Sequence, residues 1–336
     1  MERTNVKPDR IFELGYAFRG ARALMSAVEL GVFTALAQSP RECDTLRRQL
    51  GLDNRGAQDF FDALVALGLL QRDDNGRYTN SPEADLYLDR DKTSYIGGFV
   101  ENLNAREYGM WGSLAQALRT GKPQTGFEAK AHYEALYSDP KRLDFFVRGM
   151  TGWTLPVAKA IAAKFPWRDY KSVIDIGTAQ GGLPVEIAQA HAHIKGGGFD
   201  LPPLKHKFDR YVADHDLAER LHFHAGDFFA DPLPAADVLV MGRVLHNWDL
   251  VTKRMLLGKA HDALQGGGAL IVYEWLIDDE RRQPSGLLSS LNMLIMTAGG
   301  FDFTPTDCIG WMQEAGFRDM YVERLVAGQS MVVAKK

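Results

Sequence analysis

An acidic residue followed by a glycine-rich turn marks the first place where the second half of the chain could bind a ligand. Asp175 lies in the apolar segment Val173–Ile176, and the turn that follows reads GTAQGG, with Gly177 and Gly181 among its glycines. Glycines let the backbone pass close to a ligand between a strand and a helix. The spacing departs from the Gly-x-Gly-x-x-Gly pattern that seats a pyrophosphate. It suits a ligand with an ammonium group and no phosphate, such as S-adenosylmethionine.

Two further strand-like segments end in residues that suit a nucleoside. Asp200 ends the next segment, where a carboxylate can accept hydrogen bonds from both ribose hydroxyls. Gly226, Asp227 and Phe228 follow the third segment, where Asp227 can receive an exocyclic amine and Phe228 can stack on adenine. Each of these residues alone is more readily explained as an ordinary turn residue. The ordered set predicts a nucleoside pocket.

A histidine and a glutamate follow the next two strand-like segments. His246 comes shortly after a segment that ends at Met241, and Glu274 directly follows the apolar run Ala269–Tyr273. An imidazole with a pKa of about 6.5 can take a proton from a phenol, and a carboxylate on its other nitrogen fixes the tautomer. An isolated histidine before a tryptophan is more often a capping or packing residue. The general-base interpretation therefore depends on the residues around it.

The elements that would position these residues alternate strands with helices after Tyr170. Leu183-Pro184 opens a helix after the glycine turn, since proline is favoured in a first turn. The predicted strands are Lys171–Ile176, four more that end at Asp200, Ala225, Met241 and Glu274, and the tail segments Met320–Val326 and Met331–Ala334. This alternation predicts an α/β fold with a mainly parallel, Rossmann-like sheet, and ligands bind such sheets at the carboxyl ends of the strands.

The first half has the pattern of a winged helix instead. Helical apolar spacing runs from Asp9 to about Leu36, and Thr45–Leu50 and Arg55–Leu67 are shorter predicted helices. A hairpin follows within Leu69–Tyr78, because Asn75-Gly76 is a strong two-residue turn signal.

DNA binding would place the second of the shorter helices in the major groove. The segment Asn54–Leu67 offers one arginine against Asp59 and Asp62, which suits phosphates poorly. A packing or dimerisation module is the preferred interpretation, and no nucleic-acid partner is expected.

Composition supports a soluble globular protein in a reducing compartment. The chain of 336 residues has 39 Lys+Arg against 43 Asp+Glu, a formal net charge of -4, so no global basic field attracts nucleic acid or anionic lipid. Its two cysteines, Cys43 and Cys308, are too few for a disulfide framework and are expected to be small buried apolar residues. No apolar run approaches the roughly 18 to 20 residues of a membrane helix. A cytoplasmic location without a membrane partner is expected.

Six short segments match the motifs of one enzyme family. They are Ile174-Asp-Ile-Gly177, Asp200-Leu-Pro202, Gly226-Asp-Phe228, Arg243-Val-Leu-His-Asn-Trp-Asp249, Leu291-Asn-Met-Leu294 and Ala315-Gly-Phe317. Together they resemble the small-molecule S-adenosylmethionine-dependent O-methyltransferases of the caffeic-acid type, including those that tailor bacterial aromatic natural products. The Arg-Val-Leu-His-x-Trp segment is the most specific motif. The resemblance covers nearly the whole chain, because that family also begins with a winged-helix dimerisation domain.

The resemblance implies a class I methyltransferase fold, S-adenosylmethionine as cofactor, a small aromatic acceptor and a homodimer formed through the N-terminal domain. It implies that His246 is the general base, that Glu274 orients it and that Asp302 flanks it from the other side. The residues expected at the cofactor are Asp175, Gly177, Gly181, Asp200, Leu201, Gly226, Asp227, Phe228, Arg243 and Thr154. Those expected at the acceptor are Met150, Trp153, Asn247, Asn292 and Met293. No metal ligand is expected.

For several of these residues a role in packing or at the surface, without contact to a ligand, stays open. Met150 and Thr154 suit a core methionine and a solvent-exposed threonine nearly as well, and Asn292 and Met293 on a bare helical stripe would be core. The expected domains are a winged-helix dimerisation domain over 1–92, a helical bridge that lines the acceptor pocket over 93–168, and a cofactor-binding catalytic domain over 169–336.

Four positions depart from the family pattern. Asn247 stands where aspartate is common, Gly242 where lysine or serine is common, Ala179 at the middle glycine of the turn, and Asp302 where glutamate is common. Gly242 cannot make the cofactor contact that a lysine or serine side chain would make there, and Arg243 could make that contact instead.

The expected reaction is methyl transfer to a hydroxyl of a small aromatic compound. The alternatives are methylation of a heteroaromatic ring nitrogen, a relative of this fold that retains the cofactor for decarboxylation or hydroxylation, and a regulator that uses the winged helix. The presence of His246 disfavours the second alternative, and the acidic helix Asn54–Leu67 disfavours the third.

Overall fold

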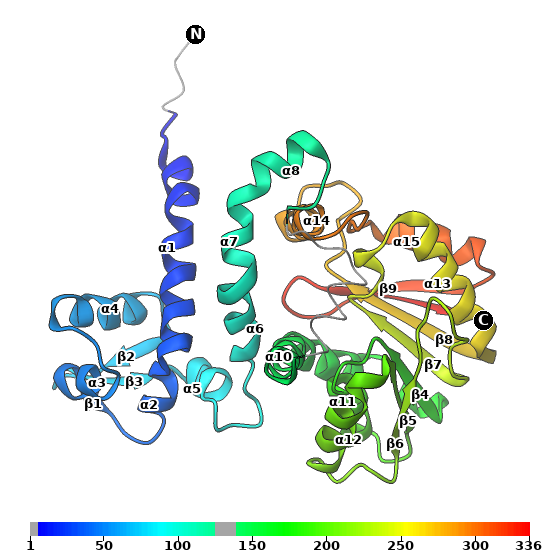
Figure 1. Cartoon of the computed structure of the whole chain (residues 1–336), viewed down its shortest axis with the longest axis horizontal. Helices are drawn as coiled ribbons and strands as arrows, with labels where there is room; N and C mark the ends of the chain where they lie inside the picture. The colour runs from blue at the N-terminus through cyan, green and yellow to red at the C-terminus, as the bar shows by residue number, and fades with distance from the viewer. Residues whose placement is uncertain (1–5, 125–138) are drawn as a thin grey trace. The chain divides into compact units, whose positions relative to one another are not determined.

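The computed structural model describes residues 6–124 and 139–336, which form two compact units. One unit runs to Tyr108 and the other from Gly109 to Lys336 (Figure 1). The boundary falls inside the expected bridge over 93–168, of which residues 125–138 lie outside the described residues.

The first unit is a winged helix with added helices. Its strands form an antiparallel sheet in the order β1-β3-β2. Gly76 in the β2–β3 turn has φ of 76°, as the predicted hairpin requires. The elements are α1 (Asp9–Leu30), α2 (Val32–Leu36), β1 (Arg41–Glu42), α3 (Cys43–Gln49), α4 (Asn54–Ala66), β2 (Leu70–Arg72), β3 (Arg77–Asn80), α5 (Pro82–Leu88), α6 (Gly97–Asn102) and the π-helical turn η1 (Leu103–Glu107).

The helical spacing predicted from Asp9 to about Leu36 is confirmed, but it forms two helices, because the chain breaks at Gly31. This residue adopts the left-handed conformation with φ of 74°, and its N–H donates to carbonyls of the last turn of α1. Glycine is the residue that most readily adopts this helix-ending geometry. The apolar spacing continues across the break, so periodicity alone did not reveal it.

The second unit contains a seven-stranded sheet in the order β6-β5-β4-β7-β8-β10-β9. The first five strands in this order pair in parallel, and β10 pairs antiparallel to both β8 and β9. Its strands are β4 (Ser172–Ile176), β5 (Lys195–Asp200), β6 (Leu221–Ala225), β7 (Ala236–Gly242), β8 (Leu264–Glu274), β9 (Arg318–Arg324) and β10 (Ser330–Lys335). The predicted strands are confirmed, with ends displaced by at most a few residues.

Helices and short turns connect these strands. After α7 (Tyr108–Met110), which links the two units, they are η2 (Trp111–Ser113), α8 (Leu114–Thr120), α10 (Pro140–Lys164), η3 (Trp167–Asp169), α11 (Gly182–Ala190), η4 (Pro202–Leu204), α12 (Lys205–Ala213), η5 (Leu245–Asn247), α13 (Leu250–Ala263), α14 (Pro284–Met296) and α15 (Pro305–Glu314). None of the helices in the described ranges is long and apolar enough to cross a membrane.

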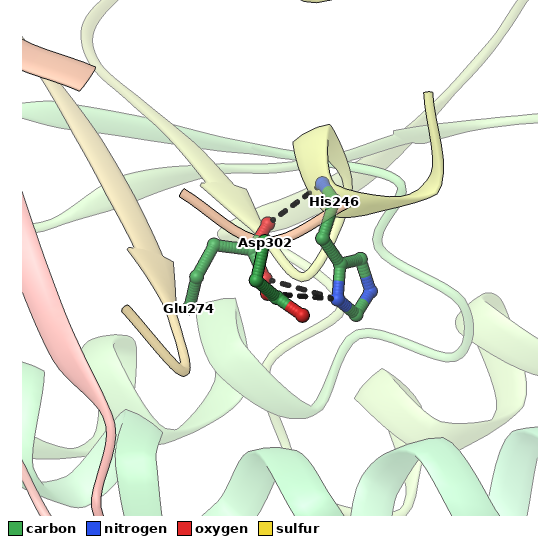
Figure 2. Close-up of side chains that lie close together, drawn as sticks. All are labelled: His246, Glu274 and Asp302. Atoms are coloured by element: carbon green, nitrogen blue, oxygen red, sulfur yellow. Dashed lines mark hydrogen bonds and ion pairs between the residues drawn. The ribbon is translucent and has the colours of Figure 1, made fainter. Parts of the chain in front are cut away.

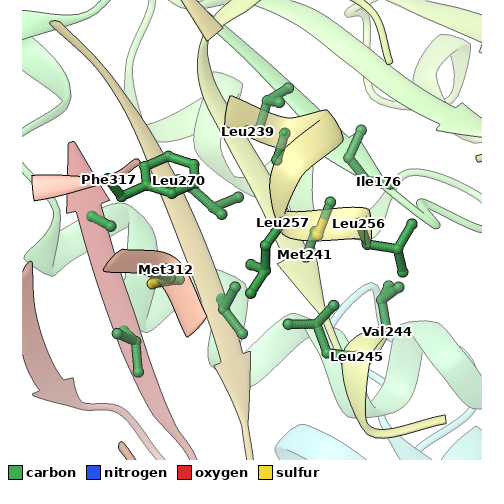
Figure 3. Packing of buried hydrophobic residues seen from close by; sticks show 14 of the residues in the cluster. Ile176, Leu239, Met241, Val244, Leu245, Leu256, Leu257, Leu270, Met312 and Phe317 are labelled. Carbon is green, nitrogen blue, oxygen red and sulfur yellow. The ribbon is translucent and has the colours of Figure 1, made fainter. Parts of the chain in front are cut away.

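Alternate side chains of the central strands pack into two cores on opposite faces of the sheet. Leu239 and Met241 of β7 pack with Leu256 and Leu257 of α13 in one core (Figure 3). Val238 and Val240 of the same strand pack with residues of α10 and α11 in the other. A strand buried on both faces reads as a continuous apolar run, which is how β7 appears in the sequence.

Strand β4 lies at the point where the strand order changes direction, with β5 on one side and β7 on the other. Ligands of open α/β sheets bind outside the carboxyl ends of the strands at such a point. The fold therefore gathers the turn after Asp175, the turn after Asp200 and the segment after Gly242 at one edge.

Helix α1 leaves large apolar side chains exposed in the isolated chain. Ile11, Phe12 and Leu14 have 74%, 56% and 62% of their surface exposed, and Tyr16 and Phe18 are about equally accessible. Contiguous apolar surface of this kind marks an interaction site. It supports the expected homodimer.

Replacing Ile11, Leu14 and Phe18 together by aspartate should convert a dimer into a monomer, because charged side chains would have to be buried at the interface. Size-exclusion chromatography with light scattering measures this directly. Arg10→Asp on the same exposed helix is the matched control and should leave the dimer intact. A triple variant that remains a folded dimer would place the interface elsewhere.

Candidate active site

The turn between β4 and α11 is built so that its backbone is accessible at the strand end. Gly177 has φ of 77° and Gly181 has φ of 93°, a region that favours glycine. A side chain at Gly181 would lie 2.7 Å from the ring of Phe208, so this glycine serves close packing. Ala179 adopts φ of 51°, and its N–H faces Asp200.

The Asp200 carboxylate ties two turns together. Its Oδ2 accepts a hydrogen bond of 2.9 Å from the Ala179 N–H, and its Oδ1 accepts one of 2.8 Å from the Leu201 N–H. Each carboxylate oxygen can accept a further bond. Asp200 is therefore held in one orientation with acceptor capacity remaining for ribose hydroxyls.

Asp175 is the most strongly perturbed carboxylate at this edge. Its residue is buried, and burial raises its pKa to about 8, with a further contribution from the charge of Asp200. Within the described residues Asp175 forms no salt bridge. A buried carboxylate without a cationic partner is an unfavourable arrangement, which a cationic ligand would relieve.

Asp227 and Phe228, in the turn after β6, form the acidic and aromatic wall of this strand edge. Asp227 accepts from the Phe229 N–H at 2.9 Å, and its own N–H donates to Asp231. Phe228 and Phe229 both pack against Trp248, with ring centroids 6.0 and 4.8 Å away. Trp248 and Phe229 were not anticipated as part of this wall.

Arg243 lies between two tryptophans. Its guanidinium carbon is 4.3 Å from the ring centroid of Trp153 on α10 and 5.0 Å from that of Trp275, which follows β8. Such cation–π contacts orient a guanidinium group without neutralising it. The structure thus brings the expected cofactor residue Arg243 and the expected acceptor residue Trp153 together, and adds Trp275.

The glycine at position 242 has a steric cause. A side chain there would lie 1.9 Å from Cζ of Tyr273, its partner across β7 and β8. Tyr273 occupies the space of a larger residue at 242, and its hydroxyl interacts with Thr154 and with the charge of Asp175. Tyr273 is a site residue that the sequence did not reveal, and it connects two that it did.

His246 lies in η5, the short turn directly after β7. Its side chain is 4% exposed. The ring Nδ1 is 3.5 Å from Glu274 Oε2 and 3.5 Å from Asp302 Oδ1, and the backbone N–H donates to Glu274 Oε1 at 3.3 Å (Figure 2). Both carboxylates approach the same nitrogen, whereas Asp302 was expected on the other side of the ring. The Nε2 atom is directed away from them (Figure 2).

Opposing electrostatic effects act on this trio. Burial alone would lower the pKa of His246, but the charge of Glu274 and the close, charged carboxylate of Asp302 outweigh burial and the charge of Arg243, so the pKa is raised. Burial also raises the pKa of Glu274, although His246 opposes the effect. Within the described residues, His246 Nδ1, Glu274 Oε2 and both Asp302 carboxylate oxygens lack a hydrogen bond of good geometry. The attraction between the imidazole and the two carboxylates, in a buried position, therefore holds the cluster together.

The loop that carries Asp302 depends on a glycine and on hydrogen bonds from its neighbours. A side chain at Gly300 would lie 2.5 Å from the His246 carbonyl oxygen, so only glycine lets the loop approach η5 this closely. The Asp302 N–H donates to Ser290 at 3.2 Å, and the Ile277 N–H donates to the Phe303 carbonyl at 2.9 Å. These contacts place Asp302 beside Glu274.

The residues expected at the acceptor differ in how they are used. The Asn247 amide donates to the carbonyl of Arg243 at 3.0 Å, so it braces the turn that carries His246. Asn292 on α14 accepts from the Trp111 indole at 3.0 Å, and Met293 is 5% exposed. Met150 on α10 is partly buried. Their contact with an acceptor stays a prediction.

Lys253 is a further residue of this region that the sequence analysis missed. Its side chain is completely buried on α13, next to the trio. A signal was present, because Lys253 interrupts the apolar stripe of Leu256, Leu257 and Ala260 on one face of a helix. The side-chain atoms of His246, Glu274 and Asp302 that could bind a metal ion lie within 4.8 Å of one another. We interpret the trio as an acid–base cluster and not as a metal site, because Lys253 already supplies a positive charge beside it.

Comparison with known proteins identifies the family. Residues 111–318 match the model of the O-methyltransferase domain, and residues 12–90 match that of the O-methyltransferase dimerisation domain. The chain is 38% identical over 330 residues to the tetracenomycin polyketide synthesis 8-O-methyl transferase TcmO of Streptomyces glaucescens, covering 98% of this chain and 97% of the relative. It is 36% identical to the N,N-dimethyltransferase OxyT of Streptomyces rimosus, covering 97% and 96%.

A solved structure agrees with both domains. Human N-acetylserotonin methyltransferase in complex with SAM superposes with a TM-score of 0.90 at 27% identity, over 100% of this chain and 99% of the human one. The fold class, the winged-helix start and the cofactor expected from the sequence are thereby confirmed. The chain belongs to the O-methyltransferase family and is an S-adenosylmethionine-dependent enzyme with an N-terminal dimerisation domain.

Proposed function

We propose that this enzyme methylates a hydroxyl group of a small, flat, polyketide-like aromatic compound, with His246 as the general base. The observation that carries the proposal is the buried imidazole whose Nδ1 faces two carboxylates, at the strand edge where the cofactor turn also lies. The relative TcmO is named for methylation of a polyketide hydroxyl, which supports this acceptor class.

The residues of the strand edge fit S-adenosylmethionine. Asp175 offers a buried carboxyl group whose ionised form an ammonium group would stabilise, Asp200 offers acceptors for ribose hydroxyls, and Phe228 offers an aromatic face for adenine. The open backbone at Gly177 leaves room beside them. When bound, the cofactor supplies a methyl group on a positively charged sulfur, which a hydroxyl oxygen can attack as it loses its proton.

His246 is suited to accept that proton. With Nδ1 turned toward Glu274 and Asp302, the imidazole carries its hydrogen on that nitrogen when neutral, so Nε2 is the basic atom. As the hydroxyl proton moves to Nε2, the imidazolium forms next to two negative charges that stabilise it. Glu274 and Asp302 act as orienting groups, and the remaining steps are binding and alignment of the acceptor.

The direct test is transfer of labelled methyl groups from S-adenosylmethionine to a panel of polycyclic phenols. We expect incorporation into at least one hydroxyl, identified by the mass of the product and the position of the new methoxy group. An absence of incorporation into every aromatic hydroxyl would contradict the proposal.

Nitrogen methylation is a second candidate, favoured by the 36% identity to the N,N-dimethyltransferase OxyT. An amine nitrogen with a free lone pair can attack without first losing a proton. The same assay with amine and heteroaromatic nitrogen acceptors distinguishes the two.

Substituting Asp200→Ala should weaken cofactor binding by about 1.5 to 3 kcal/mol, the range for hydrogen bonds to a charged group. The variant loses the acceptor for ribose hydroxyls and the link between two turns. Isothermal calorimetry with S-adenosylmethionine measures the effect. Asp214→Ala, an exposed aspartate after α12, is the matched control. Unchanged affinity in a folded Asp200 variant would show that the ribose lies elsewhere.

Substituting His246→Ala should slow methylation of a phenol by about 10²- to 10⁴-fold at neutral pH, the usual effect of losing a general base. Cofactor affinity should change little, because the preceding strand ends hold the cofactor. Raising the pH should partly restore the rate, since a phenol with a pKa of about 10 then ionises in solution.

The exposed His206→Ala variant is the control for the loss of an imidazole. Full activity of the His246 variant with a hydroxyl acceptor would make the histidine structural. Full activity with a nitrogen acceptor alone would instead favour the second candidate.

A further inference from the structure

One lysine of the catalytic unit is buried without a salt bridge. Lys253 on α13 is 0% exposed, and among the described residues its ammonium group has no carboxylate within salt-bridge distance. Its Nζ donates to the Trp248 carbonyl at 2.5 Å and lies 3.4 Å from the ring centroid of Phe301. Phe303 is a second ring, 5.5 Å away.

A lysine in such a position needs a reason, because burying an ammonium group is costly. Burial does lower its pKa, to about 8, while the charges of Glu274, Asp302 and Asp249 oppose the shift. The group is therefore mainly protonated at neutral pH. Its electrostatic partners include both carboxylates that face His246.

Lys253 offsets part of the negative charge around the imidazole. Glu274, Asp302 and, from the start of α13, Asp249 are the acidic groups of this region, and Arg243 and Lys253 are the cations that face them. Without Lys253 the region would become more negative, and a proton bound to His246 would be harder to remove.

We infer that Lys253 is an electrostatic positioning residue, whose buried ammonium group offsets the Glu274 and Asp302 carboxylates and so keeps His246 available as a base near neutral pH. The inference rests on the proposed role of His246. Lys253 does not contact the reacting atoms, and its effect is transmitted through the two carboxylates.

The charged and titratable groups that face this site come from each element packed around it. Glu274 ends β8, Asp302 lies in the loop before α15, and Arg243 follows β7. Asp249 at the start of α13 acts on Lys253, and the neutral thiol of Cys308 on α15 borders Glu274. Removal of Lys253 leaves Arg243 as the remaining cation of this set.

Three substitutions separate charge from hydrogen bonding. Lys253→Gln removes the charge but can still donate to the Trp248 carbonyl, Lys253→Met removes both, and Lys253→Arg keeps the charge. Arg254→Met, which removes an exposed cation from the next position of the same helix, is the control.

The measurement is the pH dependence of kcat/KM together with an NMR titration of the His246 ring, assigned by its loss in His246→Asn. Wild-type activity should rise with pH, because the base is active only when deprotonated. In both the Gln and the Met variants the midpoint should move to higher pH by at least about one unit, the low end for the effect of a neighbouring charge. The Arg variant and the control should stay near the wild-type midpoint.

Each outcome has a distinct meaning. A Gln variant that keeps the wild-type midpoint, beside a Met variant that loses activity or fold, would assign Lys253 a structural hydrogen bond and overturn the inference. An unchanged midpoint in both variants would also overturn it. If the wild-type enzyme transfers no methyl group to a hydroxyl, the proposed function fails, yet the NMR midpoints still decide the role of Lys253.

Discussion

The convergence of two buried carboxylates on one imidazole nitrogen is the constraint that organises the second unit. Glu274 is fixed by its place at the end of a central strand, and Asp302 by a loop that reaches the same point from a distant part of the sequence. Neither group could remain ionised in a dry interior without positive charge nearby. The positions of His246, Arg243 and Lys253 follow from that requirement. The apolar core beneath them supplies the rigidity that holds like charges close together.

Close backbone approach is the second condition on which the site depends. Gly181 admits the ring of Phe208, and Gly300 admits the turn that carries His246. In both places a methyl group would push apart the elements that bring the functional side chains together. The close packing at these glycines thus positions the functional residues at the strand ends. The glycines are therefore as necessary to the site as the acidic residues.

The sequence predicted the parts of this arrangement that are encoded locally. The parallel sheet follows from short apolar runs alternating with helices, and Asp175, Asp200 and Glu274 could be placed at strand ends by counting along those runs. Asp302 was found only through resemblance to a family, because it approaches through a loop whose path has no periodic pattern. Lys253 could have been noticed as a charged residue within the apolar stripe of its helix. Tyr273 and the stack of Arg243 between two tryptophans could not be predicted, since each depends on the direction of a side chain across elements that are not neighbours in the chain. Gly31 is different, because a glycine within a helical pattern is a recognised end signal and the break could have been anticipated.

The contact between position 242 and the ring of Tyr273 restricts the evolutionary routes open to this sequence. The two residues are partners on adjacent strands, and the ring fills the volume that any side chain at 242 would need. A larger residue at 242 therefore requires the Tyr273 ring to move or residue 273 to become smaller. The two positions should therefore vary together among descendants of this enzyme.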